Sequence, residues 1–294
     1  MSVKGLKEML DDGEFIVAPG IYEMVSALSA DRAGFQAMYM TGFGVVASYL
    51  GLPDAGLASY ADMVDRVGRI AGATRTPLIA DADTGFGGLL NVDHTVRGYE
   101  RAGAAAIQIE DQEFPKKCGH TLGRRVVSTQ DMVRKIKVAR DARDSDSFLI
   151  IARTDARTSL GLDEALRRAE AYATAGADVL FVESPESEEE MAKICVTFDL
   201  PCLANMVEGG RTPVLSRERL IEVGYSMAIF PATAFLSAAA AYDSIYDTFK
   251  RDGSSANVTV PLYKFEDMTK LMGFERVWEF DKRWPETGTD DSGK

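Results

Sequence analysis

Residues 77–83 have the sequence Pro-Leu-Ile-Ala-Asp-Ala-Asp, and residues 106–110 have the sequence Ala-Ile-Gln-Ile-Glu. Both runs are short, mostly apolar and end on acidic residues, a pattern typical of parallel strands that are covered by helices. Between them, Val92–Arg101 has apolar residues at three- and four-residue spacing, which predicts an amphipathic helix. This part of the chain therefore predicts a strand–helix–strand unit.

The same alternation continues along the chain in both directions. Further strands are predicted at Phe15–Pro19, Phe35–Met40, Phe148–Thr154, Val179–Glu183, Pro201–Asn205 and Met227–Phe230. Further helices are predicted at Tyr60–Ala71, Thr129–Arg140, Leu162–Thr174, Glu188–Phe198 and Arg217–Val223. About eight such units over about 250 residues predict a (β/α)8 TIM barrel. A doubly wound open sheet is the alternative, although such sheets usually have fewer strands.

A weak repeat supports the barrel. Glycine follows a small apolar residue wherever a helix should end, at Ala33-Gly34, Ala102-Gly103, Ala175-Gly176 and Val223-Gly224. Glycine at such a position adopts the left-handed conformation that caps a helix. No linker rich in Pro, Gly or Ser divides the sequence, so residues 1–294 are predicted to form one domain.

The C-terminal part exceeds what a barrel needs. Residues 232–284 include two predicted helical stretches, Ala232–Arg251 and Tyr263–Trp284, and form a helical extension. An apolar stripe outside a barrel often contacts another subunit, although these helices could equally pack on their own barrel. Residues 285–294 are predicted to be a disordered tail.

Composition excludes several classes of partner. The chain has 45 acidic and 33 basic residues, a formal net charge of −12, which disfavours nucleic acid and anionic membranes. The apolar stretch Ala228–Tyr242 is too short to span a membrane. Three cysteines form no disulfide framework and the N-terminus does not resemble a signal peptide, so we expect a cytoplasmic protein.

Acidic residues gather where two predicted strands end. Asp81 and Asp83 are two residues apart, so both side chains should lie on one face, and Glu110 should lie beside them at the catalytic end of the barrel. Three converging carboxylates repel one another, and a divalent cation would relieve that repulsion. Oxygen ligands without clustered His or Cys favour Mg²⁺ or Mn²⁺. The alternative is that these acids point to solvent from loops.

A second candidate segment is Lys116-Lys-Cys-Gly-His120, inside the long connection Gln112–Val127. A loop of this length after a barrel strand is often a functional lid. Positive neighbours lower the pKa of a thiol, so Cys118, beside Lys116 and His120, could be a proton donor or a nucleophile. The alternative is a surface thiol in a basic loop.

Three more polar residues end predicted strands at the same rim. Arg153 could bind a substrate carboxylate in a bidentate manner, or could pair with Glu110 or Glu183. Glu183 and Asn205 add polar groups. We therefore count Glu183 as a candidate catalytic residue and Asn205 as a candidate substrate contact, for a small anionic carboxylate.

Several motifs occur together in one order along nearly the whole chain. They are Gly51-Leu-Pro-Asp54, Asp81-Ala-Asp83, Ile109-Glu-Asp-Gln112, Lys116-Lys-Cys-Gly-His120, Ala152-Arg-Thr-Asp-Ala156, Leu203-Ala-Asn205 and Glu208-Gly-Gly-Arg-Thr-Pro213. With these motifs the chain resembles the isocitrate lyase/phosphoenolpyruvate mutase superfamily. The resemblance implies a (β/α)8 barrel whose eighth helix is swapped between the subunits of a homodimer, commonly paired into a homotetramer.

The resemblance also implies roles for individual residues. Mg²⁺ would be held by Asp81, Asp83 and Glu110, directly or through water, with Asp54 further out. The substrate carboxylates would be bound by Thr41, Gly42, Phe43, Arg153 and, once the lid closes, Gly119 and His120. The family often has Ser-Gly-Gly where this chain has Thr41-Gly-Phe43, a departure that would narrow the pocket.

The lid motif distinguishes branches of the superfamily. Members that act on P–C bonds generally lack the cysteine, whereas C–C lyases have it, so the resemblance implies cleavage of a 2-methylisocitrate- or 2,3-dimethylmalate-like 2-hydroxy carboxylate to pyruvate and a second carboxylate. Cys118 would protonate the departing carbanion. Phe181-Val-Glu183 looks more like the dimethylmalate branch. Oxaloacetate or 2-alkylmalate hydrolysis, phosphonopyruvate-type P–C chemistry and a non-catalytic binding barrel are the alternatives.

Overall fold

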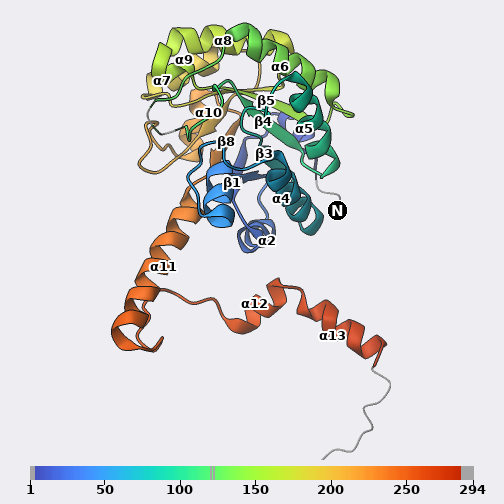
Figure 1. The fold of residues 1–294 in the computed structure, drawn as a ribbon, viewed down its shortest axis with the longest axis vertical. Coiled ribbons are helices and arrows are strands. Elements are labelled where there is room, and N and C mark those ends of the chain that lie inside the picture. Colours follow the sequence, from blue (N-terminus) through green and yellow to red (C-terminus); the bar gives the residue numbers. More distant parts are fainter. Residues whose placement is uncertain (1–3, 120, 122, 286–294) are drawn as a thin grey trace, which may run out of the picture. The chain divides into compact units, whose positions relative to one another are not determined.

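The computed structural model describes residues 4–119, 121 and 123–285 (Figure 1). The chain divides into two compact units, of which the first ends at Ala238 and the second begins at Ala239. In the described residues, eight parallel strands form a sheet in the order β6-β5-β4-β3-β2-β1-β8-β7. A parallel bridge between Leu180 of β6 and Cys202, just before β7, joins the two edges of this sheet. The sheet is therefore a nearly closed barrel.

The strands are β1 (Ile16–Ile21), β2 (Met38–Met40), β3 (Leu78–Asp81), β4 (Ala106–Glu110), β5 (Leu149–Thr154), β6 (Val179–Val182), β7 (Leu203–Asn205) and β8 (Met227–Phe230). The helices of the barrel are α1 (Leu6–Asp11), α2 (Met24–Ala33), α3 (Gly42–Val45), α4 (Tyr60–Ala73), α5 (Leu89–Arg101), α6 (Thr129–Ala142), α7 (Ala156–Leu160), α8 (Leu162–Ala175), α9 (Glu188–Thr197) and α10 (Arg217–Val223). A π-helical turn, Val46–Leu50, continues α3. The predicted (β/α)8 fold is confirmed.

Local sequence explains how these elements end and begin. The predicted helix ends at Gly34, Gly103, Gly176 and Gly224 all have positive φ, between 77° and 109°. Polar caps begin several helices; for example, the Ser59 hydroxyl accepts from the amide of Asp62 at the start of α4. The resulting short αβ turns return the chain to the barrel after each helix.

Two apolar layers stabilise the barrel. Along β5, Leu149 and Ile151 belong to the buried cluster inside the barrel, whereas Ile150 and Ala152 belong to the cluster between strands and helices. This division follows from the period of two in a strand, which sends successive side chains to opposite faces. Both faces of the sheet are buried, one inside the barrel and one under the helices, and this explains why the strand sequences are apolar almost throughout.

The N-terminal helix α1 was not predicted from the sequence. Its residues Leu6 and Met9, which are 2% and 4% exposed, join the buried cluster inside the barrel. A six-residue amphipathic helix is too short for its periodicity to stand out in a polar segment. The helix covers the interior apolar residues near the start of β1, away from the catalytic end.

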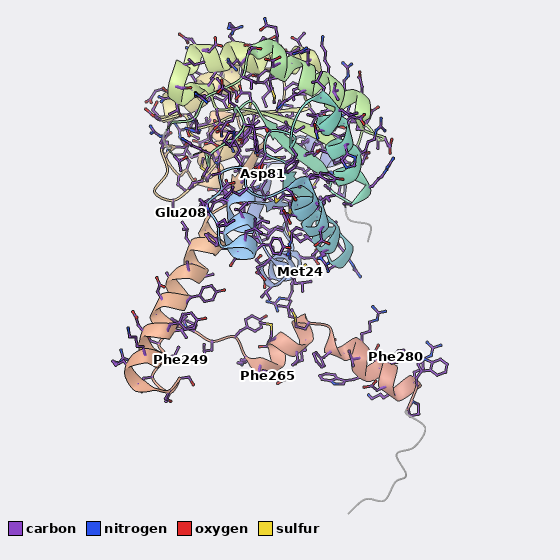
Figure 2. All side chains as sticks on the ribbon, in the orientation of Figure 1. Met24, Asp81, Glu208, Phe249, Phe265 and Phe280 are labelled. Atoms are coloured by element: carbon purple, nitrogen blue, oxygen red, sulfur yellow. The ribbon has the colours of Figure 1, made fainter. Side chains whose placement is uncertain are left out.

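The second unit begins at Ala239, inside α11 (Thr233–Asp252). It also contains α12 (Phe265–Leu271) and α13 (Phe274–Arg283). These helices match the predicted extension, and their large apolar side chains, including Phe249, Phe265 and Phe280, are exposed (Figure 2). Contact with another subunit stays a prediction, and the expected tail beyond Pro285 lies outside the described residues. Within the described chain, no helix is long and apolar enough to cross a membrane.

We expect Leu6→Ala to lower the free energy of unfolding by about 2–4 kcal/mol, because it removes a buried side chain and leaves a cavity under the barrel. Chemical denaturation followed by circular dichroism measures this change. The control is Glu8→Ala on the exposed face of the same helix, with an expected change below about 0.5 kcal/mol. Equal effects of the two substitutions would contradict the role of α1.

Candidate active site

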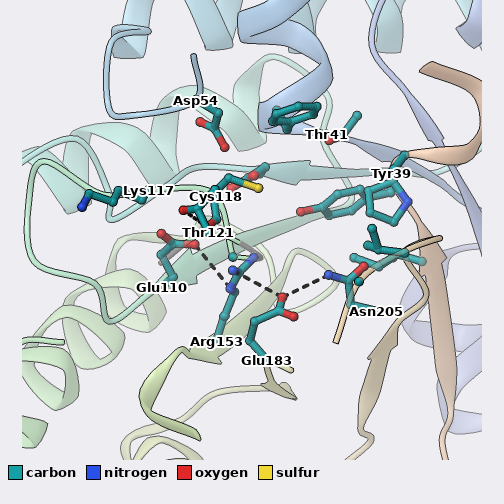
Figure 3. A pocket seen from close by; sticks show the side chains of 18 of the residues that line it. Tyr39, Thr41, Asp54, Glu110, Lys117, Cys118, Thr121, Arg153, Glu183 and Asn205 are labelled. Atoms are coloured by element: carbon teal, nitrogen blue, oxygen red, sulfur yellow. Dashed lines mark hydrogen bonds and ion pairs between the residues drawn. The ribbon is translucent and has the colours of Figure 1, made fainter. Parts of the chain in front are cut away.

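A cavity with a volume of about 310 Å³ opens at the C-terminal ends of the strands. Its lining includes Tyr39, Cys118, Arg153 and Asn205, which come from β2, the lid, β5 and β7 (Figure 3). Such a volume suits a small organic ligand, and this end of a (β/α)8 barrel is where active sites are built. The structure thus brings together residues that the sequence analysis selected from separate segments.

The two aspartates after β3 are both buried, but their backbone differs from the prediction. β3 ends at Asp81, and Asp83 lies in a turn with a φ of 48°, so strand alternation does not place its side chain. Instead the turn folds back, and the Asp83 amide donates to Asp81 Oδ1 at 3.0 Å. Asp81 Oδ2 also accepts from the Gly42 amide at 3.2 Å. The Asp81 carboxylate is therefore held by two backbone amides.

Lys116 from the lid lies among these acids. Its ammonium is 2.5 Å from Asp54 Oδ1 and 2.7 Å from Asp83 Oδ1, and all three side chains are buried. Burial raises the pKa of Asp83 to about 7, against the opposing charge of Lys116. Burial alone would lower the pKa of Lys116, yet the surrounding carboxylates raise it well above its usual value. The site is strongly acidic, and the ammonium of Lys116 is buried between Asp54 and Asp83.

The donors suit a divalent cation. Asp54, Asp81, Asp83 and Glu110 offer only oxygen, and burial raises the pKa of Glu110 well above its usual value. The buried Oε1 of Glu110 has no hydrogen-bond partner within the part of the chain that the structure describes. Among the same residues, no three acidic, His or Cys side chains are already grouped as a metal site. The chemistry of these residues fits Mg²⁺ or Mn²⁺, while their present arrangement is centred on Lys116.

Arg153 connects the acids of neighbouring strands. Its Nε is 2.9 Å from Asp155 Oδ2 and 3.3 Å from Glu110 Oε2, and its Nη2 is 3.3 Å from Glu183 Oε2 (Figure 3). Burial alone would lower the pKa of Arg153, but the charges of Asp155 and Glu110 raise it well above its usual value. Asn205 Nδ2 donates to Glu183 Oε2 at 3.0 Å. The guanidinium is therefore fixed and permanently charged beside the cavity. Its predicted pairing with Glu110 and Glu183 is confirmed, and binding of a substrate carboxylate stays a prediction.

The lid brings Cys118 to the cavity. The Cys118 amide donates to the carbonyl of Asp54 at 3.1 Å, and the base of the lid is closed by an antiparallel bridge between Gln112 and Val126. Gly119 approaches Arg153 so closely that a Cβ there would lie 2.2 Å from Arg153 Nη2. Cys118 and Gly119 thus lie where the sequence placed them, whereas His120 lies outside the described residues.

The segment that follows β2 also lines the cavity. Thr41 caps α3, and a Cβ on Gly42 would lie 2.6 Å from Asp81 Oδ2, so only glycine allows this approach. The side chain of Phe43 lines the cavity. Of the residues that the resemblance named for substrate binding, Thr41 and Phe43 therefore line the cavity, and Gly42 between them lies against Asp81.

Sequence reasoning assigned no role to Asp155 and Tyr39. Asp155 holds Nε and Nη2 of Arg153 and also pairs with Arg124 of the lid. Asp155 directly follows the end of β5, and its position beside Arg153 in the sequence was the available signal. Tyr39 lines the cavity and donates to Gln108 Oε1 at 2.9 Å, but an aromatic residue in an apolar strand gives no such signal.

Comparison with known proteins agrees with this geometry. A family model described as phosphoenolpyruvate phosphomutase matches residues 6–250. The chain is 48% identical to 2,3-dimethylmalate lyase of Eubacterium barkeri, over 95% of this chain and 96% of that protein. It is 41% identical to 2-methylisocitrate lyase of Aeropyrum pernix, over 95% of this chain and 88% of that protein.

Among solved structures, oxaloacetate acetylhydrolase in complex with 3,3-difluorooxalacetate superimposes with a TM-score of 0.91, at 35% identity and 98% coverage of both chains. Fold, cavity and relatives agree with the motifs in the sequence. The chain belongs to the phosphoenolpyruvate mutase/isocitrate lyase superfamily and groups with its carbon–carbon lyases.

Proposed function

We propose that the protein cleaves the C2–C3 bond of a 2-hydroxy carboxylate related to 2,3-dimethylmalate or 2-methylisocitrate, releasing pyruvate and a second carboxylate, with Mg²⁺ or Mn²⁺. The observation that carries the proposal is that Cys118 lines the same cavity as Arg153 and the buried acids. A binding protein would need the arginine but would have no use for a proton donor in its lid. Similarity to proteins named as lyases supports the same class.

Asp81, Asp83 and Glu110 would hold the metal ion, with Asp54 further out. Their oxygens are buried, and burial raises the pKa values of Asp83 and Glu110 against the opposing charges of Lys116 and Arg153. When bound, the ion supplies positive charge that stabilises the oxygen of the forming 2-oxo acid. Lys116 already neutralises part of this acidic group from the lid side.

The remaining groups would bind and orient the substrate. Arg153, fixed by Asp155, offers a planar guanidinium to a substrate carboxylate. Because Gly42 and Gly119 have no Cβ, their backbone lies directly against Asp81 and Arg153. Because these groups are fixed before the substrate binds, little reorganisation is needed as charge develops.

The reaction would proceed as a retro-aldol-type cleavage. A base removes the proton of the C2 hydroxyl, the C2–C3 electrons leave with C3, and C2 becomes the carbonyl of pyruvate. The C3 fragment departs as a carboxylate-stabilised carbanion. The Cys118 thiol donates its proton to that carbon, and the thiolate is later reprotonated from solvent.

Oxaloacetate hydrolysis is the second candidate, since the superposition with oxaloacetate acetylhydrolase covers nearly the whole chain. The two reactions differ in product, because hydrolysis of oxaloacetate gives oxalate and acetate. An oxalate assay on the same purified protein separates them.

We expect pyruvate release from 2,3-dimethylmalate, 2-methylisocitrate or 2-methylmalate in the presence of Mg²⁺, and loss of release with EDTA that excess Mg²⁺ restores. Coupling to lactate dehydrogenase measures the pyruvate. Absence of pyruvate from all three substrates, together with oxalate from oxaloacetate, would favour the hydrolase instead.

We expect Cys118→Ser to lower kcat by at least about a hundredfold, because a hydroxyl is a much weaker acid than a thiol. Metal binding, measured by calorimetry, should be retained. The matched control is Cys195→Ser on α9, outside the cavity lining, which should keep full activity. Wild-type rates in Cys118→Ser would exclude the thiol as the proton donor.

A further inference from the structure

The buried charged side chains of the strand ends and the apolar side chains occupy different sides of the cavity. The charged groups Asp81, Glu110, Arg153 and Glu183 come from the ends of β3 to β6. The opposite side comes from the ends of β2, β7 and β8 and presents Phe43, Val207, Ala232 and Leu236, which we call the apolar wall. A substrate bound in this cavity would therefore contact charged groups on one side and the apolar wall on the other.

We propose that the apolar wall receives the substituent on C3 of the substrate and selects a methyl group over both hydrogen and a carboxymethyl group. The inference rests on the proposed function and specifies its substrate class as a 3-alkyl dicarboxylate rather than a tricarboxylate. Three substrates that share C1, C2 and the C2 methyl differ at this position: 2-methylmalate has hydrogen, 2,3-dimethylmalate has methyl, and 2-methylisocitrate has carboxymethyl.

Aromatic packing holds the wall in place. The Phe43 ring packs edge-to-face on Phe235, with ring centroids 5.6 Å apart, and Phe235 packs in the same way on Tyr22 at 5.2 Å. Tyr22 is buried in the main core of the barrel. Phe43 is 37% exposed and Leu236 is 44% exposed, so apolar surface remains available at the cavity. A substrate methyl group packed on these side chains would remove apolar surface of the wall and of the methyl group itself from water, which favours binding.

Charge on this side disfavours a third carboxylate. Glu208, which follows Val207, lines the cavity and accepts a hydrogen bond from the Thr233 hydroxyl at 2.6 Å. The described cations of the lining are elsewhere: Arg153 is bound by acids of β4 to β6, and Lys116 and Lys117 belong to the lid. A carboxylate against the wall would lose water and gain a like charge as its neighbour, which is unfavourable.

The test compares kcat/KM for pyruvate release from the three substrates. We expect 2,3-dimethylmalate to exceed each of the others by about tenfold or more, within the range for one apolar group in a pocket. Phe43→Ser should lower the ratio of 2,3-dimethylmalate to 2-methylmalate by about tenfold, whereas Phe43→Leu, which keeps an apolar side chain, should largely keep it. Val196→Ser on the exposed surface of α9 is the control and should leave the ratio unchanged.

A second variant tests the charge. Glu208→Gln keeps an acceptor for Thr233 and removes the charge, so the ratio of 2-methylisocitrate to 2,3-dimethylmalate should rise by about three- to tenfold. Preference of the wild type for 2-methylisocitrate, or an unchanged methyl preference in a folded Phe43→Ser variant, would overturn the inference while leaving the lyase intact. Absence of pyruvate from every substrate would instead overturn the proposed function itself.

Discussion

The rest of the site depends on one electrostatic constraint, the burial of several carboxylates at one end of the barrel. Asp54, Asp81, Asp83 and Glu110 are all buried, and the ammonium of Lys116 contacts two of them. Removing like charges from water is costly, and the raised pKa of Asp83 is the sign of that cost. A parallel barrel creates this situation because its strands all end together, and a bound cation would relieve it.

The division of the cavity follows from the same topology. β3 and β4 end in acids and β6 is followed by Glu183, and these strands lie on one side together with β5, which contributes Arg153. The strands β2, β1, β8 and β7 form the other arc, and the helices α3 and α11, which follow β2 and β8, contribute Phe43 and Leu236 to the cavity. Under the proposed function, reaction chemistry and substrate selection would therefore fall to different strands.

Much of this could be predicted from sequence, because long periodic segments carry strong signals. Ala106–Glu110 and Met227–Phe230 were predicted with their observed bounds, and the cavity contains nearly all the described candidate residues. Short elements such as α1 and α7 were missed, since five or six residues show little periodicity. The turn at Asp83 bonds to β4, and the Lys116 contacts depend on where the lid folds, so no local periodicity encodes either of them.

The most direct test of the account is Mn²⁺ binding to the purified protein, followed by electron paramagnetic resonance of the free ion. We expect one Mn²⁺ per chain, competed by Mg²⁺, with affinity reduced at least tenfold by Glu110→Gln and unaffected by Asp93→Asn on the partly exposed face of α5. Failure of the wild-type protein to bind Mn²⁺ at millimolar concentration would contradict the account, because Lys116 and Arg153 would then have to balance the buried acids without a metal ion.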